Sequence, residues 1–331
     1  MHLSRLFDLT DKVTLEKGDD DLVITHLTSD SRNVRKGSLF AAISGNLSDG
    51  HNYIDSAIKN GAVAILAEGR DLVIPDGIAL LRADNVRGCF AIACSKFWPS
   101  RPSFTVAVTG TNGKTSTVEF LRQLWERNTW NAVSLGTLGA RSSTVLKVPS
   151  SGLTTPSSEY FFSALNSFSK QNISYLAIEA SSHGLEQQRM NGLNVQVAVF
   201  TNLSRDHLDY HSNMDAYFES KQKLFLDYLA DGGHAVINID NPYGKKLLEN
   251  VRKRPVSIVT FGEDSQADFC IESIKPTGYG LELNVLFKDK KYTCPLGLTG
   301  AFQASNALAA GISAYLSGLP VEIALRSLSF L

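Results

Sequence analysis

The 331-residue sequence has few cysteines, no long apolar run and almost no net charge. Its four cysteines (Cys89, Cys94, Cys270 and Cys294) lack the spacing of zinc or redox motifs, so we expect buried thiols in a reducing compartment. No apolar run approaches the ~18 residues of a membrane span, and the N-terminus lacks an apolar signal core. With 32 Lys and Arg against 33 Asp and Glu, no basic excess favours nucleic acid. These absences predict a cytoplasmic protein without membrane or nucleic-acid partners.

What is present is typical of a folded α/β protein. A hydrophobic content of 43% with 20% charged residues excludes a disordered chain. The prolines at 99 and 102 interrupt helix and strand and indicate a linker. Before it, strands are expected at Gly37–Ile43 and Ala62–Ala67, and helices at Tyr53–Asn60 and Val86–Phe97. Residues 1–102 are therefore predicted to form a small α/β domain.

After the linker, short apolar strands alternate with helices, which predicts a mostly parallel sheet covered on both faces. From Ala267 to Tyr292 strand follows strand, which predicts an antiparallel subsheet. This central domain is expected over residues 103–318, and a further helix from Val321. Its strands are expected at Phe104–Val108, Ala132–Leu135, Tyr175–Ile178, Val195–Phe200, Ala235–Ile239 and Ser257–Phe261, and its helices at Lys114–Arg127, Ser157–Lys170, Asp215–Leu229 and Ala301–Leu316.

The sharpest local signal is the segment 109–115, TGTNGKT, between an apolar strand and a helix. Backbone N–H groups in such a turn, with a helix N-terminus, bind polyphosphate. Lys114 is then expected to contact the outer phosphates, and the Thr115 hydroxyl to bind Mg²⁺. The segment is a shortened P-loop, because Val108 stands where the general pattern requires glycine. A strand-to-helix turn with an incidental lysine is the alternative, and we favour nucleotide binding.

Polar side chains follow two further apolar strands. Glu179 ends the strand Tyr175–Ile178, at the sheet edge where open α/β sheets bind ligands, and a carboxylate there suits Mg²⁺. Taken alone, Glu179 is equally well interpreted as a cap of a loop or helix. The strand Val195–Phe200 leads into a polar segment with His207, which by itself indicates a structural histidine. Lys221 by itself indicates a solvated lysine on a helix.

Together these motifs resemble the Mur ligase family, the ATP-dependent amide ligases of peptidoglycan precursor synthesis. The segments that carry the resemblance are 109–115 (TGTNGKT), 179–185 (EASSHGL), 201–209 (TNLSRDHLD), 217–221 (YFESK) and 299–306 (TGAFQASN). Their order and spacing match together, which is more specific than any one motif. Segments 30–32 with 37–41, 153–156 and 181–185 are similar to the branch that adds a third amino acid, meso-diaminopimelate or L-lysine, to UDP-N-acetylmuramoyl-L-alanyl-D-glutamate.

The resemblance implies an organisation for the chain. In the family, an N-terminal domain holds the UDP end of the substrate, a central domain binds ATP and a C-terminal domain delivers the amino acid. Residues 1–102 would be the first, residues 103–318 the second, and residues 319–331 the start of a third that is otherwise missing. The expected partners are UDP-N-acetylmuramoyl-dipeptide and an amino acid, meso-diaminopimelate being favoured, and a monomer is expected.

The resemblance also implies roles for residues at motif positions. Lys114, Glu179, His207 and Lys221 would be catalytic. Thr115 and Glu179 would hold one Mg²⁺, and His207 and Lys221 a second. Lys221 would be carbamylated by CO₂, which turns a cation into an anion with oxygen ligands. ATP would bind Gly110, Thr111, Asn112, Gly113, Lys114, Thr115, Ser116 and Asn306. The UDP-muramoyl-peptide would bind Ser31, Thr154, Thr155, Ser181, Gln187 and Arg189. Two positions depart from the family: Gln303 stands where Asn is usual, and Asn46 where His is common.

The implied reaction is phosphoryl transfer followed by acyl transfer. The terminal carboxylate of the substrate attacks the γ-phosphate of ATP, and the amine of the incoming amino acid then attacks the acyl phosphate. Two alternatives stay open. One is a non-catalytic remnant that binds UDP-precursor and ATP, and the other is an unrelated P-loop kinase or NTPase, which leaves the Glu179, His207 and Lys221 motifs unexplained.

The run Arg252-Lys253-Arg254 is interpreted as a solvated helix end, not a nucleic-acid patch.

Overall fold

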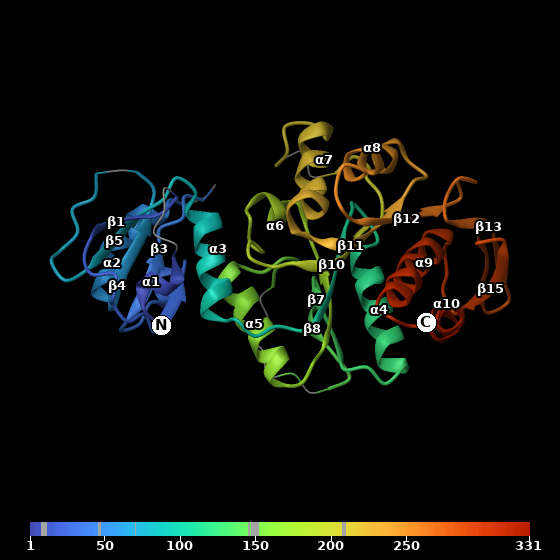
Figure 1. Cartoon of the computed structure of the whole chain (residues 1–331), viewed down its shortest axis with the longest axis horizontal. Coiled ribbons are helices and arrows are strands. Elements are labelled where there is room, and N and C mark those ends of the chain that lie inside the picture. The colour runs from blue at the N-terminus through green and yellow to red at the C-terminus, as the bar shows by residue number, and fades with distance from the viewer. Residues whose placement is uncertain (8–11, 46–47, 70, 145, 147–151, 207–209) are drawn as a thin grey trace. The chain divides into compact units, whose positions relative to one another are not determined.

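The computed structural model resolves into two compact units (Figure 1). It describes all residues except 8–11, 46–47, 70, 145, 147–151 and 207–209. The first unit comprises residues 1–100, 157–166 and 187–193, and the second comprises residues 101–156, 167–186 and 194–331. Both units are therefore assembled from segments that are not contiguous in the sequence.

The first unit is built on a five-stranded sheet in the order β1-β5-β4-β3-β2. Its edge strand β1 is antiparallel to β5, and the other neighbours are parallel. The core beneath the sheet includes Phe40, Ile65 and Leu80, all nearly inaccessible to solvent. The elements are α1 (Leu3–Leu6), β1 (Thr14–Lys17), β2 (His26–Thr28), η1 (Ser31–Asn33), β3 (Ser38–Ala41), η2 (Gly50–Tyr53), α2 (Ile54–Lys59), β4 (Ala62–Ala67), β5 (Ala79–Arg82) and α3 (Val86–Phe97).

The second unit is built on a ten-stranded sheet in the order β15-β14-β13-β12-β11-β10-β6-β9-β7-β8. The strands from β13 to β7 in that order run parallel, and antiparallel pairs flank them at both ends. These strands are β6 (Phe104–Thr109), β7 (Ala132–Gly136), β8 (Gly139–Arg141), β9 (Tyr175–Glu179), β10 (Val195–Phe200), β11 (Leu229–Asn238), β12 (Ser257–Gly262), β13 (Phe269–Thr277), β14 (Gly280–Phe287) and β15 (Lys290–Leu296).

Helices cover the parallel part of this sheet. Right-handed crossovers place α4 on one face and α7 and α8 on the other, and α9 packs beside α4 (Figure 1). The central strands are continuous apolar runs because both of their faces are covered, as in β6, which is buried from its second residue onward. The helices are α4 (Lys114–Arg127), α5 (Ser158–Lys170), α6 (Ser182–Glu186), α7 (Met214–Lys223), η3 (Leu224–Tyr228), α8 (Pro242–Val251), α9 (Ala301–Leu316), α10 (Val321–Arg326) and η4 (Ser327–Phe330).

The predicted fold class is confirmed: a small α/β sheet is followed by a mostly parallel sheet with an antiparallel subsheet. The helices predicted at Val86–Phe97, Lys114–Arg127 and Ala301–Leu316 have the predicted bounds. The strand β11 is longer than predicted, because it already begins at Leu229.

The helix predicted at 215–229 is present to within one residue at each end, but its second half is a π-helix. The α-helix ends at Lys223 and continues as a short π-helix to Tyr228. Arg254 explains this ending, because its Nη1 donates to the carbonyl oxygens of Phe225, Leu226 and Leu229 at 2.9–3.0 Å. The interpretation of Arg254 as part of a solvated helix end is therefore wrong, because its guanidinium caps a helix.

Two of the four thiols differ from the prediction of burial. Cys94 and Cys294 are buried, whereas Cys89 and Cys270 are half-buried, because they lie on the outer sides of α3 and β13.

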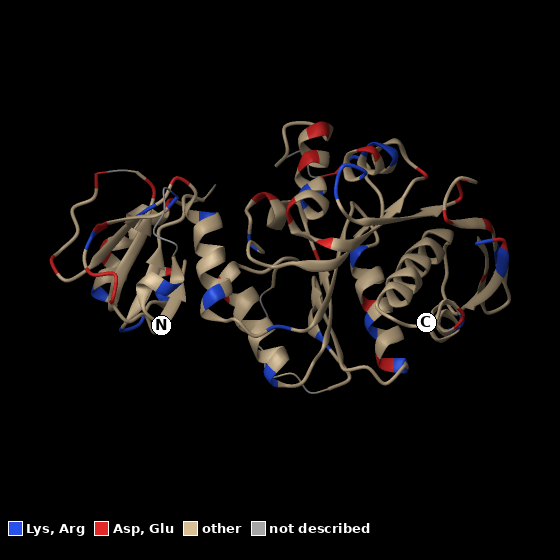
Figure 2. Ribbon diagram, in the orientation of Figure 1, with Lys and Arg blue, Asp and Glu red and all other residues tan. Residues whose placement is uncertain are grey.

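None of the described helices is long and apolar enough to cross a membrane. Lys and Arg are interspersed with Asp and Glu in both units (Figure 2).

Candidate functional site

The turn between β6 and α4 has the geometry of a phosphate-binding loop. Gly110 and Gly113 have φ values of 150° and 86°, which side chains rarely adopt, and Gly113 is the N-cap of α4. A Cβ atom at Gly113 would clash with the side chain of Asn306. The glycines thus allow a tight turn that aims the first N–H groups of α4 at a ligand, and a helix N-terminus favours an anion there.

The turn is held in place by the loop that follows β10. Thr201 Oγ1 donates to the Asn112 carbonyl at 2.6 Å, and the Asn112 N–H donates to Asn202 Oδ1 at 3.0 Å. The Thr111 hydroxyl accepts a hydrogen bond from the Ser204 N–H at 3.0 Å and donates one to the Ser204 carbonyl at 3.2 Å. The conformation of the turn is therefore held by the side chains of Thr201 and Asn202 and by the backbone of Ser204.

Two lysines from different helices converge on one carbonyl of this turn. Lys114 Nζ donates to the carbonyls of Gly110 and Thr111 at 3.0 and 2.9 Å. Lys221 Nζ, from α7, donates to the same Gly110 carbonyl at 2.8 Å and is 1% exposed. Two ammonium groups that share one carbonyl repel each other, so the arrangement favours an anion at this point.

Burial is the main cause of the altered acidity of both amines. It lowers the pKa of Lys114, an effect that the nearby Glu179 and Asp206 oppose. It lowers the pKa of Lys221 much further, and the positive charge of Lys114 adds to the decrease. The two lysines are therefore electrostatically coupled.

The carboxylate of Glu179 lies at the C-terminal end of β9, beside the N-terminus of α4. Thr115 Oγ1 donates to Glu179 Oε2 at 2.9 Å, and the Thr137 N–H donates to Oε1 at 2.8 Å. Glu179 is 2% exposed, and a Cβ atom at Gly136 would clash with its carboxylate. A buried carboxylate beside a hydroxyl supplies the oxygen ligands that Mg²⁺ prefers, so Thr115 and Glu179 could hold this ion.

Three of the predicted substrate-binding residues lie beside Glu179. Thr155 Oγ1 donates to the Glu179 carbonyl at 2.9 Å and accepts from the Ser181 N–H at 3.0 Å. The hydroxyls of Thr154 and Thr137 are 3.0 Å apart. Thr137 also donates to the Glu179 carboxylate at 3.2 Å, so a chain of hydroxyls connects the predicted metal and substrate residues.

The other three predicted substrate-binding residues belong to the first unit. Arg189 donates through Nε and Nη2 to Gln187 Oε1 at 3.1 and 2.8 Å. The Ser31 carbonyl accepts from Asn60 Nδ2 at 3.1 Å. Within this unit the Gln187 oxygen thus orients the Arg189 guanidinium, whose planar fork suits a carboxylate or a phosphate.

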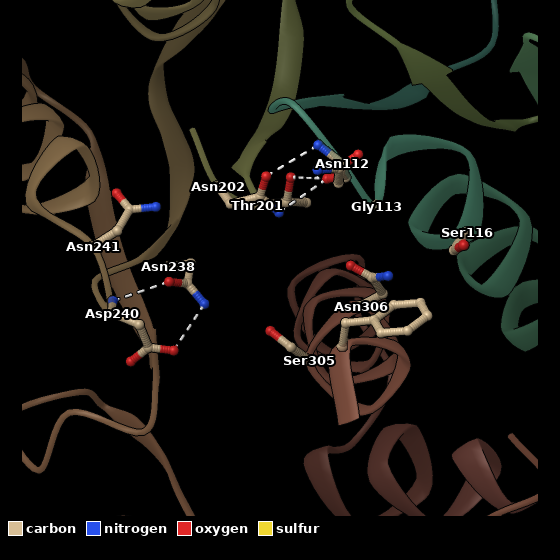
Figure 3. A pocket seen from close by; sticks show the side chains of 11 residues that line it. Asn112, Gly113, Ser116, Thr201, Asn202, Asn238, Asp240, Asn241, Ser305 and Asn306 are labelled. Carbon is tan, nitrogen blue, oxygen red and sulfur yellow. Dashed lines mark hydrogen bonds between the residues drawn. The ribbon is translucent and has the colours of Figure 1, made fainter. Parts of the chain in front are cut away.

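A cavity of about 630 Å³ opens beside the phosphate-binding turn (Figure 3). Its size is in the range of small-molecule sites. Of the predicted residues, Asn112, Gly113, Ser116 and Asn306 line it. Sequence reasoning missed the other lining residues: Thr201, Asn202, Asn238, Asp240, Asn241, Phe302 and Ser305. The polar segment after β10 was a usable signal for Thr201 and Asn202, whereas Asn238 at the end of β11 and Asn241 after it belong to no motif.

The structure brings together the predicted residues Gly110 to Ser116, Glu179, Lys221 and Asn306 in the second unit. His207 and Asn46 lie outside the described residues. Within the described part of the chain, no group of three or more His, Cys, Asp or Glu side chains could hold a metal ion.

Comparison with known proteins identifies the class to which this fold and site belong. Residues 108–314 match the family model for the Mur ligase middle domain, and residues 23–96 match the model for the Mur ligase family, catalytic domain. The chain therefore belongs to the Mur ligase family.

Comparison with individual proteins narrows the likeness to one kind of Mur ligase. The chain is 36% identical over 312 residues to the UDP-N-acetylmuramoyl-L-alanyl-D-glutamate--2,6-diaminopimelate ligase of Brucella melitensis, covering 94% of this chain and 63% of that protein. It is 37% identical over 317 residues to the ligase of the same name from Zymomonas mobilis, covering 96% of this chain and 64% of that one. The chain thus spans less than two thirds of the length of these relatives.

Solved structures agree on the fold. A structure of a UDP-N-acetylmuramoyl-L-alanyl-D-glutamate--2,6-diaminopimelate ligase superposes with a TM-score of 0.87 at 25% identity, covering all of this chain and 66% of that one. The MurF ligase of Thermotoga maritima, solved in complex with ADP, superposes with a TM-score of 0.62 at 23% identity, covering 95% of this chain and 67% of that one. The second likeness concerns the fold alone.

Proposed function

We propose that this chain carries the ATP-binding and acyl-substrate-binding parts of a ligase that adds the third amino acid to UDP-N-acetylmuramoyl-L-alanyl-D-glutamate. One observation carries the proposal: the amines of Lys114 and Lys221 meet at the Gly110 carbonyl, next to the paired Thr115 and Glu179. An isolated phosphate-binding turn does not need a second buried lysine or a carboxylate bonded to its threonine. In a ligase that transfers phosphate to a carboxylate, both would help to stabilise the charge that develops on the transferring phosphoryl group, the lysine directly and the carboxylate by holding Mg²⁺.

The ATP phosphates would lie on the turn Gly110 to Ser116, and the nucleoside in the adjoining cavity, where Asn306 would contact adenine. Lys114 would balance charge on the transferring phosphoryl group, since its amine is already held at the turn. Thr115 and Glu179 would hold one Mg²⁺, and His207 and Lys221 would hold a second. When bound, Mg²⁺ would offset the negative charge of the phosphates.

Lys221 would act as a carbamate. Burial lowers the pKa of its amine, which increases the fraction of the neutral, nucleophilic form. The neutral nitrogen forms a bond to the carbon of CO₂ and loses one proton, and the product is an anion with two oxygen atoms. That anion would contribute oxygen ligands to the second Mg²⁺ and would remove the repulsion between Lys221 and Lys114.

The reacting end of the acyl substrate would bind in the second unit, through Thr154, Thr155 and Ser181 next to Glu179. Its carboxylate oxygen would form a bond to the γ-phosphorus while the bond from phosphorus to the β,γ-bridging oxygen breaks. The amine of meso-diaminopimelate, or of L-lysine, would then attack the acyl carbon and release phosphate. We assign the UDP end to the first unit, through Ser31, Gln187 and Arg189.

Phosphate release tests this proposal directly. The full chain is supplied with Mg-ATP and UDP-N-acetylmuramoyl-L-alanyl-D-glutamate, with and without meso-diaminopimelate or L-lysine. Phosphate release that depends on the amino acid supports the ligase, and Lys114→Met is expected to lower it more than a hundredfold. Binding of both ligands without release would favour a binding protein, the second candidate. No affinity for the UDP-dipeptide would overturn the assignment.

A further inference from the structure

Gln303 and Asn306 share a hydrogen bond at the start of α9. Asn306 Nδ2 donates to Gln303 Oε1 at 3.0 Å. Residues three apart face the same side of a helix, so this pair is favoured by its spacing. Asn306 lines the 630 Å³ cavity and is 6% exposed, which limits the conformations open to its side chain.

This hydrogen bond fixes which end of the Asn306 amide faces the cavity. An amide donates through nitrogen and accepts through oxygen, and here the nitrogen is engaged by Gln303. In Figure 3 the oxygen of Asn306 points toward the interior of the cavity and the nitrogen points away. Among the described residues, no donor forms a hydrogen bond with this oxygen. Asn306 therefore presents an acceptor to whatever occupies the cavity.

Two other side-chain amides that line the cavity form hydrogen bonds with the protein through both their oxygen and their nitrogen. Asn202 binds the Asn112 backbone through both ends of its amide, at 3.0 and 3.1 Å. Asn238 accepts from the Asp240 N–H at 3.0 Å and donates to the Asp240 carboxylate at 3.3 Å. Asn306 differs from these two because its carbonyl oxygen is available to a ligand.

We propose that Gln303 determines the base specificity of this site by holding Asn306 as an acceptor. The inference rests on the proposed binding of ATP in the cavity. Adenine carries an amino donor at position 6, where guanine carries an oxygen acceptor. The Asn306 oxygen would accept a hydrogen bond from the amino group of adenine and would repel the oxygen of guanine. A flipped amide would reverse the preference, and the Gln303 acceptor disfavours the flip because it would face the Asn306 oxygen.

The test compares substitutions that keep or remove the acceptor at position 303. Gln303→Glu keeps an oxygen that accepts from Asn306, whereas Gln303→Met is similar in length and cannot accept in the same way. Gln303→Leu is a second variant without an acceptor. Dissociation constants for non-hydrolysable analogues of Mg-ATP and Mg-GTP are measured by calorimetry on the full chain, with the melting temperature of each variant recorded.

The ratio of the GTP constant to the ATP constant is the decisive quantity, because a general loss of affinity cancels in it. We expect the unsubstituted chain and Gln303→Glu to prefer ATP to the same degree, and Gln303→Met and Gln303→Leu to lose on the order of tenfold of that preference. An unchanged ratio in folded Gln303→Met and Gln303→Leu would overturn this inference and leave the proposed function standing. Absence of ATP binding by the unsubstituted chain would overturn both.

Discussion

At the scale of single residues, the position of the Glu179 carboxylate depends on the missing side chain of Gly136. A methyl group there would clash with that carboxylate, so Gly136→Ala is expected to displace it from Thr115 and Thr137. We predict that Mg-ATP affinity falls on the order of tenfold, since one charge-assisted contact is lost. Calorimetric titration with Mg-ATP measures the change.

The matched control is Gly278→Ala, on the turn between β13 and β14. A Cβ atom at Gly278 meets nothing within 4 Å, so this variant is expected to bind Mg-ATP like the unsubstituted chain. Equal affinity in both alanine variants would show that the position of Glu179 does not matter for the nucleotide.

Cys294 predicts a pH dependence of stability. Burial raises the pKa of this thiol from its ordinary value of 9.0, which applies to the unfolded chain, to about 11. Between these values the unfolded chain loses the proton that the folded chain retains. The free energy of unfolding therefore falls as pH rises, by about 2–3 kcal/mol in total for this group.

Urea denaturation from pH 8 to pH 11 measures this effect. Cys294→Ala is expected to have a flatter profile than the unsubstituted chain, although it is less stable at pH 8 because a buried sulfur is lost. Thr293→Ala, at the exposed neighbouring position, serves as the control and should retain the original slope. Parallel profiles for the unsubstituted chain and Cys294→Ala would contradict the shifted pKa.

At the scale of elements, Arg254 terminates η3 from a distant part of the chain. It donates to three carbonyls at the end of that helix and to the Asp231 carboxylate at 2.5 Å. Arg254→Met is expected to cost on the order of 2 kcal/mol, because partly buried carbonyls lose their donor. Arg252→Met removes only a surface pair with Glu249 and should cost under about 0.5 kcal/mol. Equal losses in urea denaturation would refute the capping role.

The elements that the sequence predicted best are those that pack an apolar face against a core. The strand β10 and the helices α3, α4 and α9 have the predicted bounds, because apolar runs and helical periodicity reflect contact with a core. The strands β1, β2 and β8 were not predicted. Each has three or four residues and depends on pairing with a neighbouring strand more than on its own composition.

The site was predictable where its residues are contiguous. Residues 110–116 form one turn that their own glycines allow, so the sequence alone predicted that these residues lie close together. Gly136 and Thr137 lie at the end of β7 and Asn238 at the end of β11, and only the strand order brings them near the nucleotide turn. The role of Lys221 came from the resemblance alone, since a lysine on a helix gives no sign of its burial.

At the scale of the whole molecule, the sequence could not show that residues 157–166 and 187–193 belong with the first unit. Contacts between distant residues hold them there. The Ser29 hydroxyl donates to Glu159 Oε1 at 2.8 Å, and Asn85 Nδ2 donates to Gln188 Oε1 at 2.7 Å. The predicted division into two consecutive domains near residue 102 could not include such contacts, because they form only when the chain has folded.

This division into units predicts where each ligand protects the backbone. Binding stabilises the native state of the unit that holds the ligand, so exchange of its amide hydrogens slows. In hydrogen-exchange mass spectrometry, Mg-ATP is expected to protect 106–118 and 300–308 in the second unit. UDP is expected to protect peptides near Ser31 and 187–193 in the first. Protection by Mg-ATP confined to the first unit would refute the assignment, because no residue assigned to the nucleotide lies there.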